Sequence, residues 1–339
     1  MIIHDNIEFH NVAELVPWEH PSGLALYRYP REVRRHLSTL GHHAAACSDG
    51  VELRFSAPPA WATVTLSARC NYPFGEGAKV RIYRGDIPVE ETLLRDGATK
   101  TFALMEPPLI ASVTSAAWAG GRFSPQLWRI VTSGATVIYH DVDSVGIPVR
   151  PPATHEKPRA RWLAYGSSIT NATPGYVEHA ARLLGVDVFN KGLSGACMCE
   201  PETAAYLAEA EEWDFATLEL GVNMRGAFDA GEFESRARVL IETIRAAAAD
   251  RPIVVVDILP NSDDFLSEPG HNTAKNRDFR TALEGICADF RDAKTHYIDG
   301  KNILTSFSGL SADLIHPSPD GHQLMGQNLA RLIRELGIV

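Results

Sequence analysis

The sequence predicts an α/β protein in which an antiparallel β-sandwich of jelly-roll character precedes a three-layer α/β/α domain with a parallel sheet. Three observations support this prediction. Apolar and polar residues alternate with a period of two between residues 51 and 139, which is typical of half-buried strands. Short apolar strands alternate with longer helical patterns in the second half, which predicts a parallel sheet covered by helices. The 339 residues exceed what one core usually holds, so we expect two domains.

The first half contains short strands separated by glycine-rich turns. The alternation is clearest over residues 51–55, 64–68, 80–83 and 136–139. Closely spaced strands of this kind are expected to pair as an antiparallel sandwich. Four prolines between residues 147 and 158 end the alternation and predict a stiff, extended connection. We therefore place the sandwich domain at residues 1–150 and the second domain at residues 151–339.

The second half contains five apolar stretches that we expect to be strands, at residues 161–165, 188–189, 216–220, 253–259 and 297–298. Between them, apolar residues recur with helical spacing. One such face carries Phe233, Ala237, Leu240, Ile241 and Ile244, and another carries Val177, Ala180, Ala181 and Leu184. Reactive groups in parallel sheets gather at the carboxyl ends of strands. Functional residues are therefore expected directly after these strands.

The composition excludes several classes of function. The formal net charge is -10 and no long run of Lys or Arg occurs, so a nucleic-acid partner is not expected. No apolar run approaches the roughly 20 residues of a membrane helix, and the first residues lack a signal-peptide pattern. The 5 cysteines are irregularly spaced, which fits reduced thiols. The sequence thus predicts a cytoplasmic protein without a membrane partner.

A candidate nucleophile, Ser168, directly follows the first strand of the second domain. It stands in the run Gly166-Ser167-Ser168-Ile169-Thr170. A serine at a glycine-containing strand end is held out of the sheet, where a base can reach its Oγ. By itself the run also fits an ordinary turn, because glycine and serine are common in turns.

A candidate activating pair, Asp313 and His316, lies on one loop ahead of the last predicted helix. A carboxylate three residues before a histidine can fold back onto Nδ1 and leave Nε2 to accept the serine proton. The alternative is a carboxylate that binds backbone amides beside a surface histidine. His322 is a weaker candidate for the base, because it lies at the start of the last helix and no aspartate stands three residues before it.

Two further loops supply candidate donors to an oxyanion. Gly195 ends a glycine-containing loop after the second strand, and Asn223 follows the third strand. With the N–H of Ser168, the Gly195 N–H and the Asn223 amide would form a three-donor oxyanion hole. Each loop alone is more typical of a turn or a cap. The hypothesis depends on all four features occurring at strand ends, in one order.

Three other polar residues stand in or near these loops. Asp257 and Glu219 lie in apolar strands and are expected to be structural carboxylates with internal hydrogen bonds. Arg225 follows Asn223 in the same loop; it would either line the site or form a surface salt bridge. Cys197 and Cys199 form a close pair, but no second Cys or His pair stands at ligand spacing, so no metal is expected.

These four blocks resemble those of the SGNH (GDSL-like) hydrolase superfamily, which centre on Ser, Gly, Asn and His. The runs 166–170, 192–195, 221–223 and 313–317 are similar to the four blocks in order. The chain from about residue 160 onward resembles a bacterial subgroup that carries an N-terminal β-sandwich. The aspartate of the first block is Ser167 here, so its usual hydrogen bonds are either absent or made by a hydroxyl. The position of Ile169-Thr170 favours Ser168 over Ser167 as the nucleophile.

The resemblance implies a flavodoxin-like fold and a serine esterase that needs no cofactor or metal. Ser168 would attack, His316 would transfer the proton and Asp313 would orient His316, with Gly195 and Asn223 at the oxyanion. It also implies short acyl groups, with acetyl expected, on a carbohydrate or another small polar alcohol. Two alternatives remain: a lysophospholipase or thioesterase with the same triad, and a non-catalytic carbohydrate-binding protein on a hydrolase scaffold.

Overall fold

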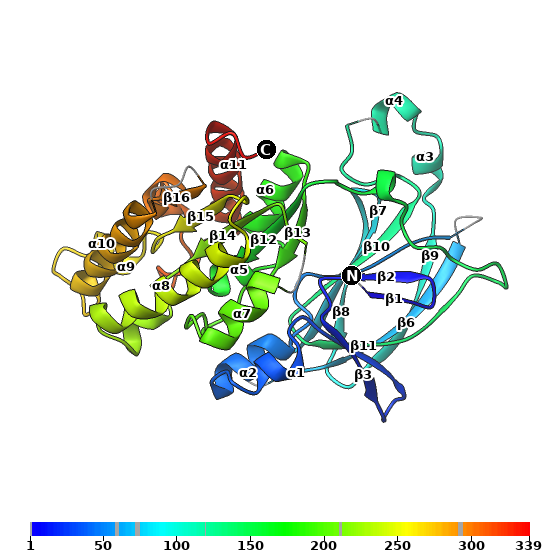
Figure 1. Cartoon of the computed structure of the whole chain (residues 1–339). Coiled ribbons are helices and arrows are strands. Elements are labelled where there is room, and N and C mark those ends of the chain that lie inside the picture. Colours follow the sequence, from blue (N-terminus) through cyan, green and yellow to red (C-terminus); the bar gives the residue numbers. More distant parts are fainter. Residues whose placement is uncertain (1, 58–60, 72–74, 119, 210–211, 291–293) are drawn as a thin grey trace. The chain divides into compact units, whose positions relative to one another are not determined.

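The computed structural model describes residues 2–57, 61–71, 75–118, 120–209, 212–290 and 294–339. The chain forms two compact units (Figure 1). Unit 1 comprises Met1–Arg35 and His42–Arg159, and unit 2 comprises His36–Gly41 and Ala160–Val339.

Unit 1 contains two antiparallel sheets that form a β-sandwich. The first sheet has, in spatial order, β1 (Ile2–His4), β2 (Ile7–His10), β5 (Val51–Ser56), β10 (Leu127–Ser133), β7 (Gly77–Arg84) and β8 (Ile87–Arg95). The second has β3 (Glu14–Trp18), β4 (Gly23–Tyr27), β11 (Thr136–Asp143), β6 (Trp61–Arg69) and β9 (Thr99–Met105). The helices along this part of the chain are α1 (Arg31–Arg34), α2 (Thr39–Ala46), α3 (Pro108–Ala111), α4 (Ser115–Trp118) and η1 (Thr154–Glu156).

The facing sides of the two sheets share one apolar core. Leu53 and Ile130 of the first sheet belong to the same buried cluster as Leu66 and Val137 of the second. The strands predicted from alternation are therefore confirmed, since each lies within a strand whose apolar residues point into this cluster.

Unit 2 is built on a parallel sheet of five strands. In spatial order these are β13 (Asp187–Asn190), β12 (Arg161–Tyr165), β14 (Phe215–Glu219), β15 (Ile253–Val256) and β16 (Thr295–Ile298). The longer helices are α6 (Tyr176–Leu184), α7 (Pro201–Glu209), α8 (Ala230–Ala247), α10 (Thr273–Asp289) and α11 (Pro319–Glu335). The shorter ones are α5 (Ser168–Asn171), α9 (Ser262–Phe265), η2 (Met224–Gly226), η3 (Gly300–Asn302) and η4 (Phe307–Gly309).

Helices cover both faces of this sheet, as the strand pattern predicted (Figure 1). Residues of α6 and α11 share a buried cluster with residues of β12, β14 and β15. All four residues of β15 are buried, as expected for a strand that is covered on two sides. The apolar faces predicted for α6 and α8 are buried, and α6 ends at Gly185 with a positive φ of 72°. Glycine takes this conformation without strain.

Candidate active site

The turn after β12 presents two adjacent serines in different environments. The turn begins at Gly166. A side chain does not fit at this position, because a Cβ there would lie 2.4 Å from Thr170 Oγ1 and 2.7 Å from Glu219 Oε2. Ser167 is the N-cap of α5, and its Oγ accepts a hydrogen bond from Ile169 N. Ser168 is the first helical residue, so its N–H has no carbonyl partner within the helix.

The hydroxyl of Ser167 is bound to a buried carboxylate. Glu219 Oε2 accepts hydrogen bonds from Ser167 Oγ at 2.7 Å and from Ser167 N at 2.8 Å. Thr170 Oγ1 donates to the same oxygen at 3.1 Å. Burial raises the pKa of Glu219 to about 6, although these hydrogen bonds act to lower it. The internal hydrogen bonds expected of Glu219 are confirmed, and a hydroxyl stands where the wider superfamily has an aspartate.

Ser168 contacts the predicted histidine. Its Oγ lies 2.8 Å from His316 Nε2, and His316 Nδ1 lies 2.6 Å from Asp313 Oδ2. The second carboxylate oxygen of Asp313 accepts from the backbone N of Ile315 and of His316, both at 3.0 Å. The fold therefore brings these three predicted residues into one hydrogen-bonded series.

The charge of Asp313 determines that Nδ1 of His316 is a protonated ring nitrogen. Burial acts to raise the pKa of Asp313, but the hydrogen bonds from His316 and the two amides outweigh it and lower the pKa to about 2. The carboxylate is thus ionised at neutral pH and can only accept hydrogen bonds. Nδ1 of His316 must carry the proton, which leaves Nε2 to accept from Ser168.

The turn that carries Asp313 and His316 is held by backbone hydrogen bonds. Ser311 N donates to His316 O at 2.7 Å and Leu314 N donates to Ser311 O at 3.0 Å. Leu314 has a φ of 54°, a conformation that is uncommon for a residue with a side chain. The amide of Ser262, which follows β15, donates to Leu314 O at 2.7 Å.

Gly195 lies in a loop that is joined to the turn of Ser168. Leu193 N donates to Gly166 O at 2.8 Å, and Asn171 Nδ2 donates to Ser194 Oγ at 2.9 Å. Gly195 has a φ of 69°, and a Cβ there would lie 2.9 Å from Leu40 Cδ2. Both its conformation and its surroundings therefore favour glycine.

Asn223 is joined in turn to the loop of Gly195. Its Oδ1 accepts a hydrogen bond from Cys197 N at 3.1 Å. With the oxygen occupied in this way, the NH2 group is the part of the amide that can donate to another group. Gly195 thus lies between Ser194, which is bound to α5, and Cys197, which is bound to Asn223. The role of both residues at an oxyanion stays a prediction.

His322 and Asp257, which the sequence analysis did not place in the active site, have structural roles. His322 Nδ1 accepts from Tyr176 N at 3.2 Å, and burial lowers the pKa of His322 to about 4. This ring is neutral at pH 7 and is not the partner of Ser168. Asp257 accepts from Tyr297 Oη at 2.5 Å and from Gly300 N at 2.6 Å, which confirms it as a structural carboxylate.

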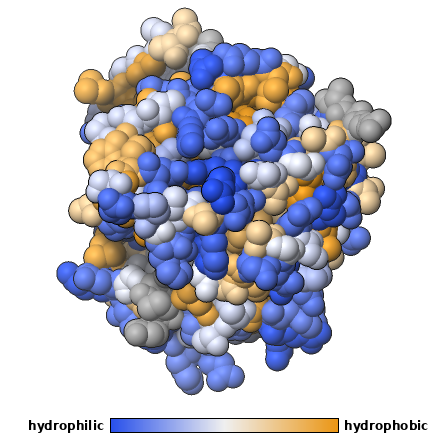
Figure 2. Space-filling view, turned by 90° about the vertical axis from the view of Figure 1, so that its left-hand side faces the viewer, coloured by the Kyte–Doolittle hydropathy of each residue, from blue (hydrophilic) through white to orange (hydrophobic). Residues whose placement is uncertain are grey.

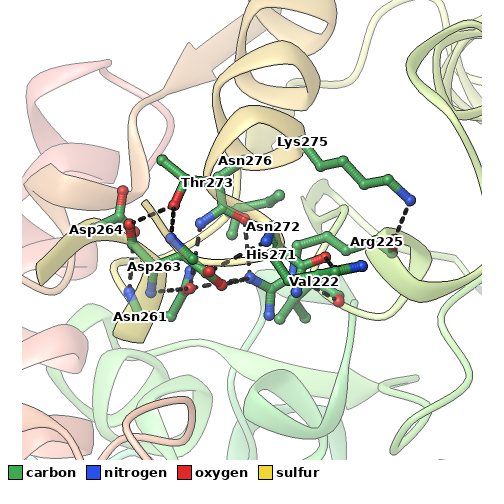
Figure 3. A network of polar contacts seen from close by, with 12 residues as sticks. Val222, Arg225, Asn261, Asp263, Asp264, His271, Asn272, Thr273, Lys275 and Asn276 are labelled. Carbon is green, nitrogen blue, oxygen red and sulfur yellow. Dashed lines mark hydrogen bonds and ion pairs between the residues drawn. The ribbon is translucent and has the colours of Figure 1, made fainter. Parts of the chain in front are cut away.

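The surface salt bridge considered for Arg225 is wrong. This side chain is buried, and its Nη1 contacts Asn261 Oδ1, Asp263 Oδ2 and Asn276 Oδ1 (Figure 3). Sequence reasoning missed these partners. In the run that begins at Asn261, after β15, an asparagine is followed by acidic residues, which is typical of a helix N-terminus but does not identify Arg225 as a partner.

Other features of the described residues bear on the chemistry. They contain no group of three or more His, Cys, Asp or Glu residues that could hold a metal ion. All 5 cysteines are free thiols. No helix within the described ranges is long and apolar enough to cross a bilayer.

Comparison with known proteins gives one family and several related folds. Residues 163–324 match the GDSL-like Lipase/Acylhydrolase family. A search of curated proteins finds no match. The solved structure of the salicylyl-acyltransferase SsfX3 from a tetracycline biosynthetic pathway is similar, with a TM-score of 0.78 and 19% identity over 98% of this chain and 96% of that chain.

Two carbohydrate esterases have similar folds. One is a family two carbohydrate esterase from Clostridium thermocellum in complex with cellohexaose, with a TM-score of 0.60 and 17% identity over 86% of this chain and 95% of that chain. The other is the acetyl xylan esterase Est2A from the rumen bacterium Butyrivibrio proteoclasticus, with a TM-score of 0.60 and 12% identity over 99% and 97%. The chain therefore contains a GDSL-like lipase/acylhydrolase domain of the SGNH superfamily, a carboxylic ester hydrolase domain that spans residues 163–324.

Proposed function

We propose that this protein is a serine esterase that hydrolyses short-chain esters, above all acetyl esters of carbohydrates, through an acyl-enzyme. The observation that carries the proposal is the series of hydrogen bonds from Ser168 Oγ to His316 Nε2 at 2.8 Å and from His316 Nδ1 to Asp313 at 2.6 Å. A hydroxyl, an imidazole and an ionised carboxylate in this order are the parts that nucleophilic acyl transfer needs.

The proposed reaction has two halves. Ser168 Oγ attacks the ester carbonyl carbon while His316 Nε2 takes its proton, and Asp313 stabilises the imidazolium that forms. The oxyanion then accepts hydrogen bonds from the N–H groups of Ser168 and Gly195 and from the Asn223 amide. The bond to the alcohol oxygen breaks as His316 returns the proton to it. Water attacks the acyl-enzyme with His316 as base, which releases the acid and restores Ser168.

A polar alcohol fits two observations. Two proteins of similar fold are named as carbohydrate esterases, one of them an acetyl xylan esterase. In addition, hydrophilic residues predominate on the face of the molecule in Figure 2, where apolar residues form separate patches. A broad apolar surface would be expected of an enzyme that docks on lipid.

A longer acyl chain is the second candidate, because three apolar residues are exposed at the end of α9 and in η4, two elements that are hydrogen-bonded to the segment around the Asp313–His316 turn. Phe265, Leu266 and Phe307 are 46%, 54% and 50% exposed, and the rings of Phe265 and Phe307 pack edge to face with centroids 4.9 Å apart. Such a surface is suited to an acyl chain as well as to the apolar face of a sugar. It gives a lysophospholipase or thioesterase a physical basis.

The test compares kcat/KM for p-nitrophenyl acetate, butyrate and octanoate, and then for acetylated xylan and acetylated monosaccharides. We expect acetyl to be preferred over octanoyl, and free acetate to be released from the sugars. A clear preference for octanoyl would replace the sugar deacetylase with the longer-chain alternative. Glycerol added as a competing acceptor separates hydrolysis from transfer, since an acyltransferase would form acetylglycerol in place of acetate. The Ser168→Ala variant, prepared in the same way, is the negative control in every assay.

A further inference from the structure

Arg225 folds back onto the turn that carries Asn223. Its Nε donates to Val222 O at 3.2 Å (Figure 3). This carbonyl belongs to the peptide that precedes Asn223, so the contact fixes the backbone from which the Asn223 amide projects. Met224 N donates to Gly221 O at 3.0 Å, and the two contacts close a compact turn after β14.

The guanidinium also reaches the loop after β15. Nη1 donates to Asn276 Oδ1 at 2.9 Å, to Asn261 Oδ1 at 3.0 Å and to Asp263 Oδ2 at 3.2 Å. The side chains of Arg225 and Asp263 are only 7% and 9% exposed. A buried charge persists only when it is paired and fully hydrogen-bonded. These contacts therefore hold the turn of Asn223 against Asn261.

The residue after Asn261 contacts the catalytic histidine turn. Ser262 N donates to Leu314 O at 2.7 Å, and Leu314 lies between Asp313 and His316 in the sequence. A continuous path of contacts thus runs from the peptide before Asn223, through Arg225 and Asn261, to the turn that holds the general base.

We infer that Arg225 is a positioning residue that sets the distance between the Asn223 amide and His316, by fixing both of their turns to the Asn261–Ser262 segment. The inference rests on the proposed function, because it assigns these two groups to one transition state. Misplacement of a catalytic group by about 1 Å lowers the rate by roughly 10²-fold.

Two substitutions of Arg225 separate positioning from stability. Arg225→Lys keeps a positive charge beside Asp263, but an ammonium cannot replace a planar fork that reaches Val222 and Asn261 together. Arg225→Met removes the charge as well. We expect both to lower kcat on p-nitrophenyl acetate by about 10- to 100-fold with KM nearly unchanged, while the melting temperature falls much less for the lysine variant than for the methionine variant.

Arg129→Met is the matched control. Arg129 is a buried arginine of β10 that is also paired with a carboxylate, since its Nη2 and Nε donate to Glu52 at 2.7 and 2.9 Å. It belongs to unit 1, whereas Asn223, Asn261 and Ser262 all belong to unit 2. This variant is expected to lose stability but to keep kcat when assayed well below its melting temperature.

The other end of the path is tested at Ser262. Ser262→Pro removes the one N–H that donates to Leu314 O. Proline is well suited to this first helical position, and the extended backbone of Asn261, with φ -149° and ψ -179°, suits a residue before proline. We expect kcat to fall by about tenfold or more, whereas Ser262→Ala, which keeps the N–H, should match the wild type.

The double variant Arg225→Met/Ser262→Pro completes the test. If both residues act through one path, the kcat of the double variant should be no lower than that of the less active single variant. The reason is that effects along a shared network are not additive. Multiplied effects, or Arg225 variants that keep kcat as Arg129→Met does, would overturn the inference. An inactive wild type in which a fluorophosphonate leaves Ser168 unlabelled would instead overturn the proposed function.

Discussion

Ser167 Oγ donates a 2.7 Å hydrogen bond to Glu219 Oε2, while the adjacent Ser168 Oγ lies 2.8 Å from His316 Nε2. The two hydroxyls differ in their neighbours and also in exposure, because Ser167 is 1% exposed and Ser168 is half-buried. A carboxylate under the turn therefore keeps the first hydroxyl engaged, and only the second has a base beside it.

Ser168→Ala should lower ester hydrolysis by about 10³-fold or more, as loss of a nucleophile does in related chemistry. Ser167→Ala should leave a measurable enzyme that is less stable by about 1 kcal/mol, since it loses a helix cap. Mass spectrometry of the fluorophosphonate-labelled wild type identifies the reactive serine directly. An adduct on Ser167 would show that the nucleophile is assigned to the wrong residue.

Asn223→Ala should lower kcat by about 10²-fold, the usual effect of removing one oxyanion donor. Stability should change little, because the lost side chain accepts a single bond from Cys197 N. Steady-state kinetics and a thermal melt on the same preparation check both parts. Normal turnover would remove Asn223 from the site.

Asp313→Asn should lower kcat on the order of 10³-fold or more. The Oδ1 atom of Asp313 accepts from two backbone amides, so an asparagine oxygen is expected to keep that position and to direct its NH2 group at His316 Nδ1. Nδ1 must then accept, and the ring proton moves to Nε2, where it blocks transfer from Ser168. A variant within tenfold of the wild type would contradict this tautomer argument.

Glu219 makes folding stability depend on pH. Burial raises its pKa from 4.5 to about 6, so the folded protein binds this proton more tightly than the unfolded chain. The contribution is therefore fully present below pH 4.5 and is lost as the pH rises through 6, with a size of about 2 kcal/mol. Glu219→Gln should remove it.

Urea unfolding at pH 4.5, 5.5 and 7 measures this effect. The pKa of Asp257 is also raised to about 6 by burial, and its slope remains in both proteins, so the difference between wild type and Glu219→Gln isolates Glu219. Parallel stability curves for the two proteins would mean that folding does not shift the pKa of Glu219.

The sequence predicted the strands well where apolar residues decide them, but it did not predict how deeply β5 is buried. Residues 51–55 alternate, and alternation was interpreted as a half-buried strand. All six residues of β5 are buried, because Glu52 on its polar side accepts from Arg54 Nε at 2.8 Å and from Arg129 Nη2 at 2.7 Å. Glu52 and Arg129 are 77 positions apart in the sequence, and a pairing over that separation leaves no local signal.

The proposed catalytic residues could be predicted from the sequence, whereas the residues that hold them in place could not. Ser168, Asp313 and His316 could be found because each must stand in a short run beside glycine, proline or a fixed partner. Arg225 and Asn261 could not, since neither a buried arginine nor its neutral amide partners follow a spacing rule. Their contacts depend on β14 and β15 being neighbours, which only the folded sheet determines.

The strand order β13-β12-β14 has a consequence for how this enzyme can change. The chain passes from β12 to β13 at one edge of the sheet and then crosses back to β14 on the other side of β12, so the connections that follow β12 and β13 run in opposite directions. Ser168 stands at this topological switch point, where sheets of this kind bind their ligands. The outer parts of the loops on either side can therefore lengthen or shorten without displacing the proposed nucleophile, which is a basis for altering specificity by loop exchange.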